Sequence, residues 1–249
     1  MFAHPEAVYA IHYACQSFYS GQQVTSTRVA CISLRQLQSG QVRTFSIAKS
    51  AELFRMPGEA IGDNWNNLER SMLGEFYEFI RMNKGIKLVH WNMRDDTFGF
   101  AALEHRFKVL KGRPEEVPEQ NRMDFARLLL ELYGDDYVKG RAKLQVLSQF
   151  NKLSMADFLA GADEAHALQA GHLRKVQMST QTKVKLIADL AIMAHDRTLK
   201  TQAGVIAQHG APVRLMMQKL LHNPGYTVTS GMVGGFVVVF KAYDWLFGG

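Results

Sequence analysis

Two adjacent aspartates, Asp95 and Asp96, have the residue type and the position to take part in chemistry. They follow an apolar run at residues 86–91, which predicts a strand, and precede a stretch at 98–110 with helical periodicity. A strand end followed by a helix start places a carboxylate at the mouth of a sheet, where carboxylates can hold divalent cations. The alternative is that both aspartates are an N-cap and a first-turn acid of the helix.

Histidine and cysteine side chains are the other candidates by residue type, namely His12, Cys15, His90 and His105. A Cys–His pair could act as nucleophile and base, but nothing in the spacing requires these residues to meet. A lone histidine on a strand is more often a packed core residue. Cys15 and Cys31 form no CxxC pair, so two buried, reduced thiols are expected. No P-loop, GxGxxG, HExxH or GxSxG motif is present.

The charge of the chain is positive and unevenly distributed. The net charge is +6, and residues 7–51 contain no Asp or Glu but carry Arg28, Arg35, Arg43 and Lys49. This pattern predicts either a solvated basic strand face or a face that contacts phosphates. A net charge of +6 alone does not establish nucleic-acid binding.

Hydrophobic periodicity predicts the elements that must position these residues. Apolar runs at 8–18, 29–34 and 42–47 predict three strands, with a hairpin turn at Ser39 and Gly40. Residues 51–67 read as a loop. A helical face then combines Leu68, Met72, Phe76, Phe79 and Ile80. With the strand at 86–91 and helices from Met123 onward, the order predicts an α/β mixed sheet, a three-strand antiparallel meander plus a parallel strand, with flanking helices.

Two stretches carry a more specific pattern. Residues 29–47 (VACISLRQLQSGQVRTFSI) form an apolar strand, a polar turn with glycine and a strand that ends in Phe-x-Ile. Residues 87–106 (KLVHWNMRDDTFGFAALEHR) end a strand with His90 and Asn92, followed four residues later by Asp96 at a helix start, with Trp91 inserted between the histidine and the asparagine. Over roughly residues 8–195 the chain resembles the DnaQ-like (DEDD) 3′–5′ exonuclease family, which implies a ribonuclease H-like fold. The resemblance makes Asp96, Asp95 and His90 the catalytic candidates and Asp96 the metal-ligand candidate.

The chain departs from that family at the other two motifs. The Asp-x-Glu pair of the first strand, which supplies the central metal ligands, is missing from residues 10–18 (AIHYACQSF), and the nearest acids are Glu6 and Glu52. On the late helix, Lys183 and Lys185 stand near the position of the family's last aspartate. Acids in the same region are Asp163, Glu164, Asp189 and Asp196. The resemblance therefore implies a degenerate member without ordinary two-metal nuclease activity, and no cofactor is expected.

Three functions remain open at this stage. The first is a non-catalytic exonuclease-fold protein that binds nucleic acid or a nucleotide, within a larger assembly such as one of bacterial antiviral defence. Its contacts would be Arg28, Arg35, Arg43, Asn92 and Arg94. The second is an active nuclease or phosphodiesterase that uses Mg²⁺ or Mn²⁺. Its rearranged acids would be Asp95, Asp96, Glu104 and Asp189. The third is a structural assembly subunit that self-associates or binds a protein partner.

The third function depends on the end of the chain. Residues 198–249 are predicted to form a helical and apolar extension after an exonuclease-like domain at 1–197. Residues 232–240 (MVGGFVVVF) are too few to span a membrane as a helix, which takes about 20 apolar residues. Contact with a protein partner is therefore favoured over membrane contact. No leader sequence is evident at the N-terminus, so a cytoplasmic location is expected.

Overall fold

The centre of the structure is a mixed five-stranded sheet. The computed structural model describes residues 5–16, 26–94 and 98–202. The strands are β1 Val8–Cys15, β2 Val29–Gln36, β3 Val42–Ser46, β4 Lys87–His90 and β5 Arg122–Asp124. They lie in the order β3-β2-β1-β4-β5, with β1, β2 and β3 antiparallel and β4 and β5 parallel to β1. This confirms the predicted meander plus parallel strand, and β5 extends it.

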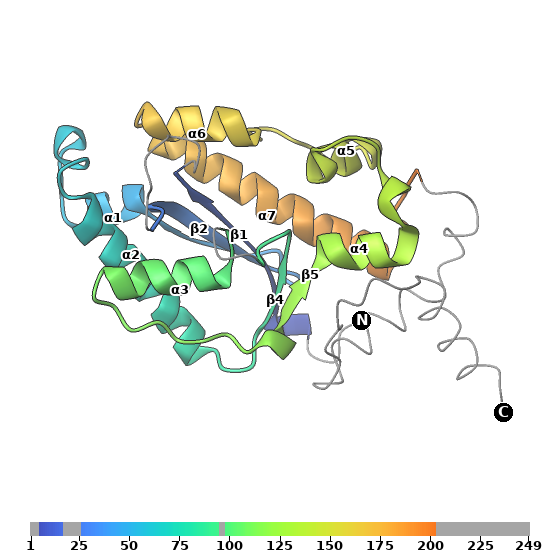
Figure 1. Ribbon diagram of the computed structural model, residues 1–249, viewed down its shortest axis with the longest axis horizontal. Coiled ribbons are helices and arrows are strands. Elements are labelled where there is room, and N and C mark those ends of the chain that lie inside the picture. Colours follow the sequence, from blue (N-terminus) through green and yellow to red (C-terminus); the bar gives the residue numbers. More distant parts are fainter. Residues whose placement is uncertain (1–4, 17–25, 95–97, 203–249) are drawn as a thin grey trace.

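Helices cover both faces of the sheet (Figure 1). On one side lie α2 Trp65–Met82 and α3 Phe100–Val109, and on the other the long α7 Leu173–His195 crosses the strands. The remaining helices are α1 Ile47–Leu53, α4 Phe125–Tyr133, α5 Lys143–Phe150 and α6 Gly161–Gln169. Single 3₁₀ turns occur at Pro5–Ala7, Gly58–Ala60, Glu119–Asn121 and Asp135–Tyr137.

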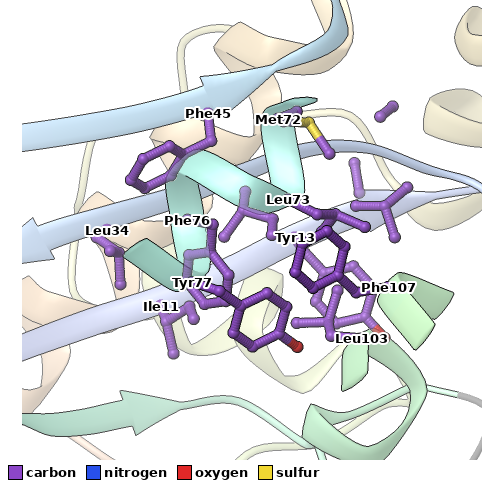
Figure 2. Packing of buried hydrophobic residues seen from close by; sticks show 14 of the residues in the cluster. Ile11, Tyr13, Leu34, Phe45, Met72, Leu73, Phe76, Tyr77, Leu103 and Phe107 are labelled. Atoms are coloured by element: carbon purple, nitrogen blue, oxygen red, sulfur yellow. The ribbon is translucent and has the colours of Figure 1, made fainter. Parts of the chain in front are cut away.

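Each face of the sheet has its own hydrophobic core, because successive residues of a strand point to opposite faces. On the α2 and α3 side, Ile11, Tyr13 and Leu34 pack against Phe76 and Leu103 (Figure 2). On the α7 side, the core includes Ala10, Val89, Leu129, Leu147 and Ile187. The predicted apolar face of α2 is confirmed, since all five of its residues are buried.

A buried ion pair ties α2 and α3 to the start of β2. Arg106 binds Glu69 through Nε to Oε1 at 2.8 Å and Nη2 to Oε2 at 2.6 Å. The backbone N–H of Val29 also donates to Oε1 of Glu69, at 2.7 Å. Because Glu69 is fully buried, these three donors must compensate the loss of its hydration.

Several predicted boundaries are wrong where a local polar contact decides them. Residue 47 belongs to a helix rather than a strand, because Ser46 caps α1 by accepting from the N–H of Lys49 at 3.2 Å. The region from Met123 was expected to be helical, but Met123 lies in β5 and Asp124 caps α4 by accepting from Arg127 N–H.

The C-terminal apolar stretch at 232–240 lies outside the described residues, and the division between 1–197 and 198–249 stays a prediction. Among the helices within residues 5–202 that the structure describes, none is both long and apolar enough to cross a bilayer.

Candidate functional site

The carboxyl end of β1 lies at the point where the sheet changes from antiparallel to parallel pairing, the position that is called the crevice of an open α/β sheet. β1 has an antiparallel neighbour, β2, on one side and a parallel neighbour, β4, on the other. β4 ends at His90, opposite Ile11, whereas β1 continues to Cys15. The last residues of β1 therefore lack a partner from β4. In open α/β sheets ligands bind at such switch points, so this is the first place to look for a site.

An aromatic side chain covers the open edge of β1. The ring of Phe98 stacks on Tyr13, with centroids 4.4 Å apart, and its centroid lies 5.8 Å from that of His12. The backbone N–H of Gly99 donates to the Tyr13 hydroxyl at 2.9 Å. Stacked aromatic pairs contribute roughly 0.5–1.5 kcal/mol beyond their buried area. Phe98 and Gly99 are thus held against the end of β1.

An ion pair between α6 and α7 lies near the carboxyl end of β1, where Lys183 affects the pKa of His12 and Glu164 that of Cys15. Lys183 Nζ lies 2.7 Å from Glu164 Oε1, and the two side chains are only 8% and 12% exposed. Ser179 donates to the same carboxylate oxygen at 2.8 Å. The Lys183 ammonium also lies 5.5 Å from the centroid of the Phe158 ring. The carboxylate of Glu164 is therefore already bound by a cation of the protein itself, Lys183.

Burial keeps the histidine on β1 neutral and the nearby thiols protonated. Burial, and next the charge of Lys183, hold the pKa of His12 well below its ordinary value. Burial raises the pKa of Cys15 and of Cys31 to about 12, so both remain thiols. Because the thiolate is the nucleophilic form, neither cysteine is activated. His105 lies on α3 rather than on β1, and its side chain is exposed.

The basic strand residues do not form one face. Arg43 pairs in register with Leu34 and points to the α2 side, where its guanidinium lies 4.8 Å from the Phe79 ring centroid. Arg35 points to the α7 side and binds Asp189 there, with Nη1 to Oδ1 at 2.7 Å. Arg28 precedes β2 and is partly exposed. The sheet separates Arg35 from Arg43 because residues of the paired strands alternate between its two faces.

His90 lies in the core on the α3 side rather than at an open surface. It is 3% exposed, its ring meets Phe100 edge-on at 5.3 Å, and its Nδ1 accepts from the Met93 N–H at 3.2 Å. Burial lowers the pKa of His90 to about 4, so the ring is neutral at pH 7.

Asn92 and Arg94 gather around the end of β5. Both are exposed, and Asn92 has a positive φ of 56°, a conformation that asparagine tolerates. Its N–H donates to Asp124 Oδ1 at 3.3 Å, and Arg94 Nη1 lies 3.1 Å from Asp124 Oδ2. Asp124 also caps α4, so a carboxylate that sequence reasoning overlooked holds this turn.

Asp95 and Asp96 lie outside the described residues. The helix that was expected to start with them begins at Phe100, with Gly99 as its N-cap residue. Two other acids of the rearranged set lie on opposite faces of the sheet. Glu104 binds Arg122 at 3.1 Å on the α3 side, whereas Asp189 binds Arg35 on the α7 side.

The side chains that the structure describes near the end of β1 offer no ligand set for a divalent metal ion. Within residues 5–16, 26–94 and 98–202, no three His, Cys, Asp or Glu side chains lie together as ligands would. The sequence places Lys183 near the position of the family's last aspartate. The spacing of residues does not predict that Lys183 pairs with Glu164 or that Phe98 stacks on Tyr13. Both contacts join segments distant in the sequence.

Comparison with known proteins gives a structural similarity that bears on the fold. No family model matches the sequence, and no curated protein matches it. The structure is similar to part of the family B DNA polymerase from the hyperthermophilic archaeon Pyrobaculum calidifontis, with a TM-score of 0.50 and 12% sequence identity. The match covers 86% of this chain and 26% of the polymerase, so the chain spans about a quarter of that protein. At this identity the similarity shows the fold alone, an α/β ribonuclease H-like arrangement.

Proposed function

We propose that this chain is an exonuclease-fold protein that binds nucleic acid without cleaving it by two-metal chemistry. The observation that carries the proposal is the ion pair between Lys183 and Glu164 in the crevice of β1. In two-metal sites, divalent cations activate water and stabilise the leaving oxygen, and carboxylates hold them. Here the ammonium group of Lys183 is bound to the carboxylate of Glu164, and β1 carries no acidic residue.

The retained fold and the positive net charge support nucleic acid as the ligand. The fold is shared with part of a DNA polymerase, and the chain carries a net charge of +6. Lys and Arg side chains that neutralise phosphates release counterions, which gives affinity without reading the sequence. Several of the described cations are already paired with acids, as Arg35 and Arg94 are. Binding would therefore depend on the cations that remain.

The nuclease alternative requires Asp95 and Asp96 to find further ligands. Its other two acids, Glu104 and Asp189, bind arginines on opposite faces of the sheet. They cannot share a metal ion with each other without refolding of the sheet. The described residues thus favour binding over cleavage.

Binding and cleavage can be tested together on labelled single- and double-stranded DNA and RNA. We expect binding that weakens as salt rises, is unchanged by EDTA, and leaves the strands intact with Mg²⁺ or Mn²⁺. Metal-dependent cleavage that is lost in Asp96→Ala would overturn the proposal and place a working site at that aspartate. Failure to bind any of the four probes would overturn it as well.

A further inference from the structure

An open hollow lies between α2 and the turn that follows α3, and its volume is about 620 Å³. The lining residues are Asn67, Arg70, Ser71, Gly74, Phe107, Lys111, Gly112 and Arg113. We propose that this hollow binds phosphate groups of a single-stranded nucleic acid. The proposal rests on the proposed function and names the surface through which it would act.

The α2 wall of the hollow is a polar face. Asn67, Arg70, Ser71 and Gly74 follow the spacing i, i+3, i+4 and i+7, which places them on one side of a helix. The opposite face of α2 carries the buried apolar residues of the core. Gly74 has no side chain to fill the hollow, so the ring of Phe107 forms the floor of the hollow. This ring stacks on Tyr77, with the ring centroids 5.1 Å apart.

Three cations border the hollow and no acid lines it. Arg70, Lys111 and Arg113 are exposed, and in the part of the chain that the structure describes no acid lies within ion-pair distance of any of them. Arg106, next to Phe107 in the sequence, is instead bound to Glu69 and Asn66. Positive charges gathered without a counter-charge repel one another, and an anion that binds between them relieves that repulsion.

Lys111 holds a backbone conformation that favours glycine. It follows the C-cap of α3 with a φ of 61°, its N–H donates to Lys108 O at 2.9 Å, and the Gly112 N–H donates to Phe107 O at 2.8 Å. These two bonds define a Schellman motif, in which the left-handed position is usually glycine. A lysine there costs conformational energy, as it does for Arg55, Lys152 and Arg197, which hold the same left-handed conformation elsewhere in the fold.

The helix dipole accounts for only part of this arrangement. Cations are favoured near the C-terminal end of a helix, which applies to Lys111 and Arg113 after α3. Arg70 belongs to the body of α2, where no such preference acts. The Schellman bonds also occupy the carbonyls of Phe107 and Lys108, so these cations are not needed to satisfy them.

The chemistry of the lining favours a phosphate backbone over a base or an enclosed small molecule. Guanidinium, ammonium, amide and hydroxyl groups all donate to phosphate oxygens. The aromatic floor, Phe107, is only 6% exposed and offers little surface on which a base could stack. Binding at the hollow is therefore expected to be independent of sequence.

The test compares two triple variants that lose the same charge. Fluorescence anisotropy measures the affinity for a labelled oligo-dT strand over a range of salt concentrations. With Arg70, Lys111 and Arg113 changed to glutamine, affinity falls about tenfold, and the slope of log K against log salt becomes shallower by about 2, since each phosphate contact on a single strand contributes about 0.7. The control changes Lys84, Lys139 and Arg141, which are exposed on other segments, to glutamine and is expected to stay within about twofold of the wild type.

The outcomes separate this proposal from the proposed function. Equal binding by the wild type and the hollow variant, or an equal loss in the control, overturns the hollow while nucleic-acid binding stands. If the wild-type chain binds no strand, the proposed function fails, and tripolyphosphate then serves as the probe. A rise in melting temperature with tripolyphosphate in the wild type but not in the hollow variant supports the anion site. The absence of that rise in the wild type overturns it.

Discussion

The crevice at the end of β1 and the hollow between α2 and α3 handle charge in opposite ways. In the crevice, the Lys183 ammonium lies against Glu164, Ser179 donates to the same carboxylate, and Phe98 covers the strand edge. In the hollow, Arg70, Lys111 and Arg113 surround an open space that no acid lines. A buried charge loses its hydration and must be compensated by other groups of the protein, whereas an exposed cation stays hydrated and is free to bind an external anion. The switch point of the sheet, where open α/β folds commonly bind ligands, therefore has its charges paired within the protein, whereas the hollow has cations available for an anion.

The largest effect is expected from breaking the crevice pair. Lys183→Met leaves the Glu164 carboxylate buried without its cation, which should lower the free energy of unfolding by about 3 kcal/mol. The double variant Lys183→Met/Glu164→Gln should recover most of that loss, because a neutral amide needs no counter-charge. Urea denaturation measures both. A loss below about 1 kcal/mol in the single variant would mean that the pair behaves like a solvent-exposed one.

Acid should destabilise the chain through His90. Its pKa is lowered by burial from 6.5 to about 4, so between these pH values the unfolded chain binds a proton that the folded chain refuses. The contribution of neutral His90 to the free energy of unfolding is therefore fully present above pH 6.5 and is lost as the pH falls to about 4. At 1.36 kcal/mol per pKa unit, the loss is roughly 3 kcal/mol. In His90→Asn, whose side chain can still accept from the Met93 N–H, urea melts at several pH values should show a shallower decline. An unchanged decline would assign the pH dependence to other groups, of which His12 is the first.

The floor of the hollow should tolerate no side chain at Gly112. A Cβ there would lie 2.1–2.3 Å from atoms of the Phe107 ring, and that ring is packed against Tyr77 (Figure 2). Gly112→Ala should thus cost about 2 kcal/mol, as overpacked cores do. At Gly74 the same addition meets the ring at 4.0 Å, an ordinary contact. Gly74→Ala should be neutral or stabilising by up to about 1 kcal/mol, because alanine favours the helix. Thermal melts that rank the two variants in the opposite order would contradict this packing.

The smallest effect is expected from Lys111→Gly in the hollow, where the free energy of unfolding should rise while the affinity for nucleic acid falls. Lys111→Gly removes the strain of a left-handed lysine and should raise the free energy of unfolding by about 0.5 kcal/mol, after the greater flexibility of unfolded glycine is subtracted. The same variant should bind single-stranded DNA more weakly. Thermal melts and anisotropy on one preparation measure both. Unchanged affinity would mean that Lys111 is strained for a reason other than binding.

The secondary structure was predictable where one element's own residues decide it. Leu68, Met72 and Phe76 define the buried face of α2 by their spacing alone. The alternation in residues 29–47 predicted the β2–β3 hairpin, and the missing Asp-x-Glu could be seen directly in β1. β5 was missed because three residues give too short a pattern, and only pairing with β4 makes them a strand.

By itself, the sequence determined the mixed sheet, the main helices, the positive charge and the absence of acids on the first strand. Only the tertiary structure decided which charges meet. It brought Lys183 to Glu164 and Arg106 to Glu69, and it placed Arg35 and Arg43 on opposite faces of one hairpin. The physical reason is range: periodicity reflects the burial of neighbouring residues, whereas an ion pair or an open hollow depends on how distant elements pack.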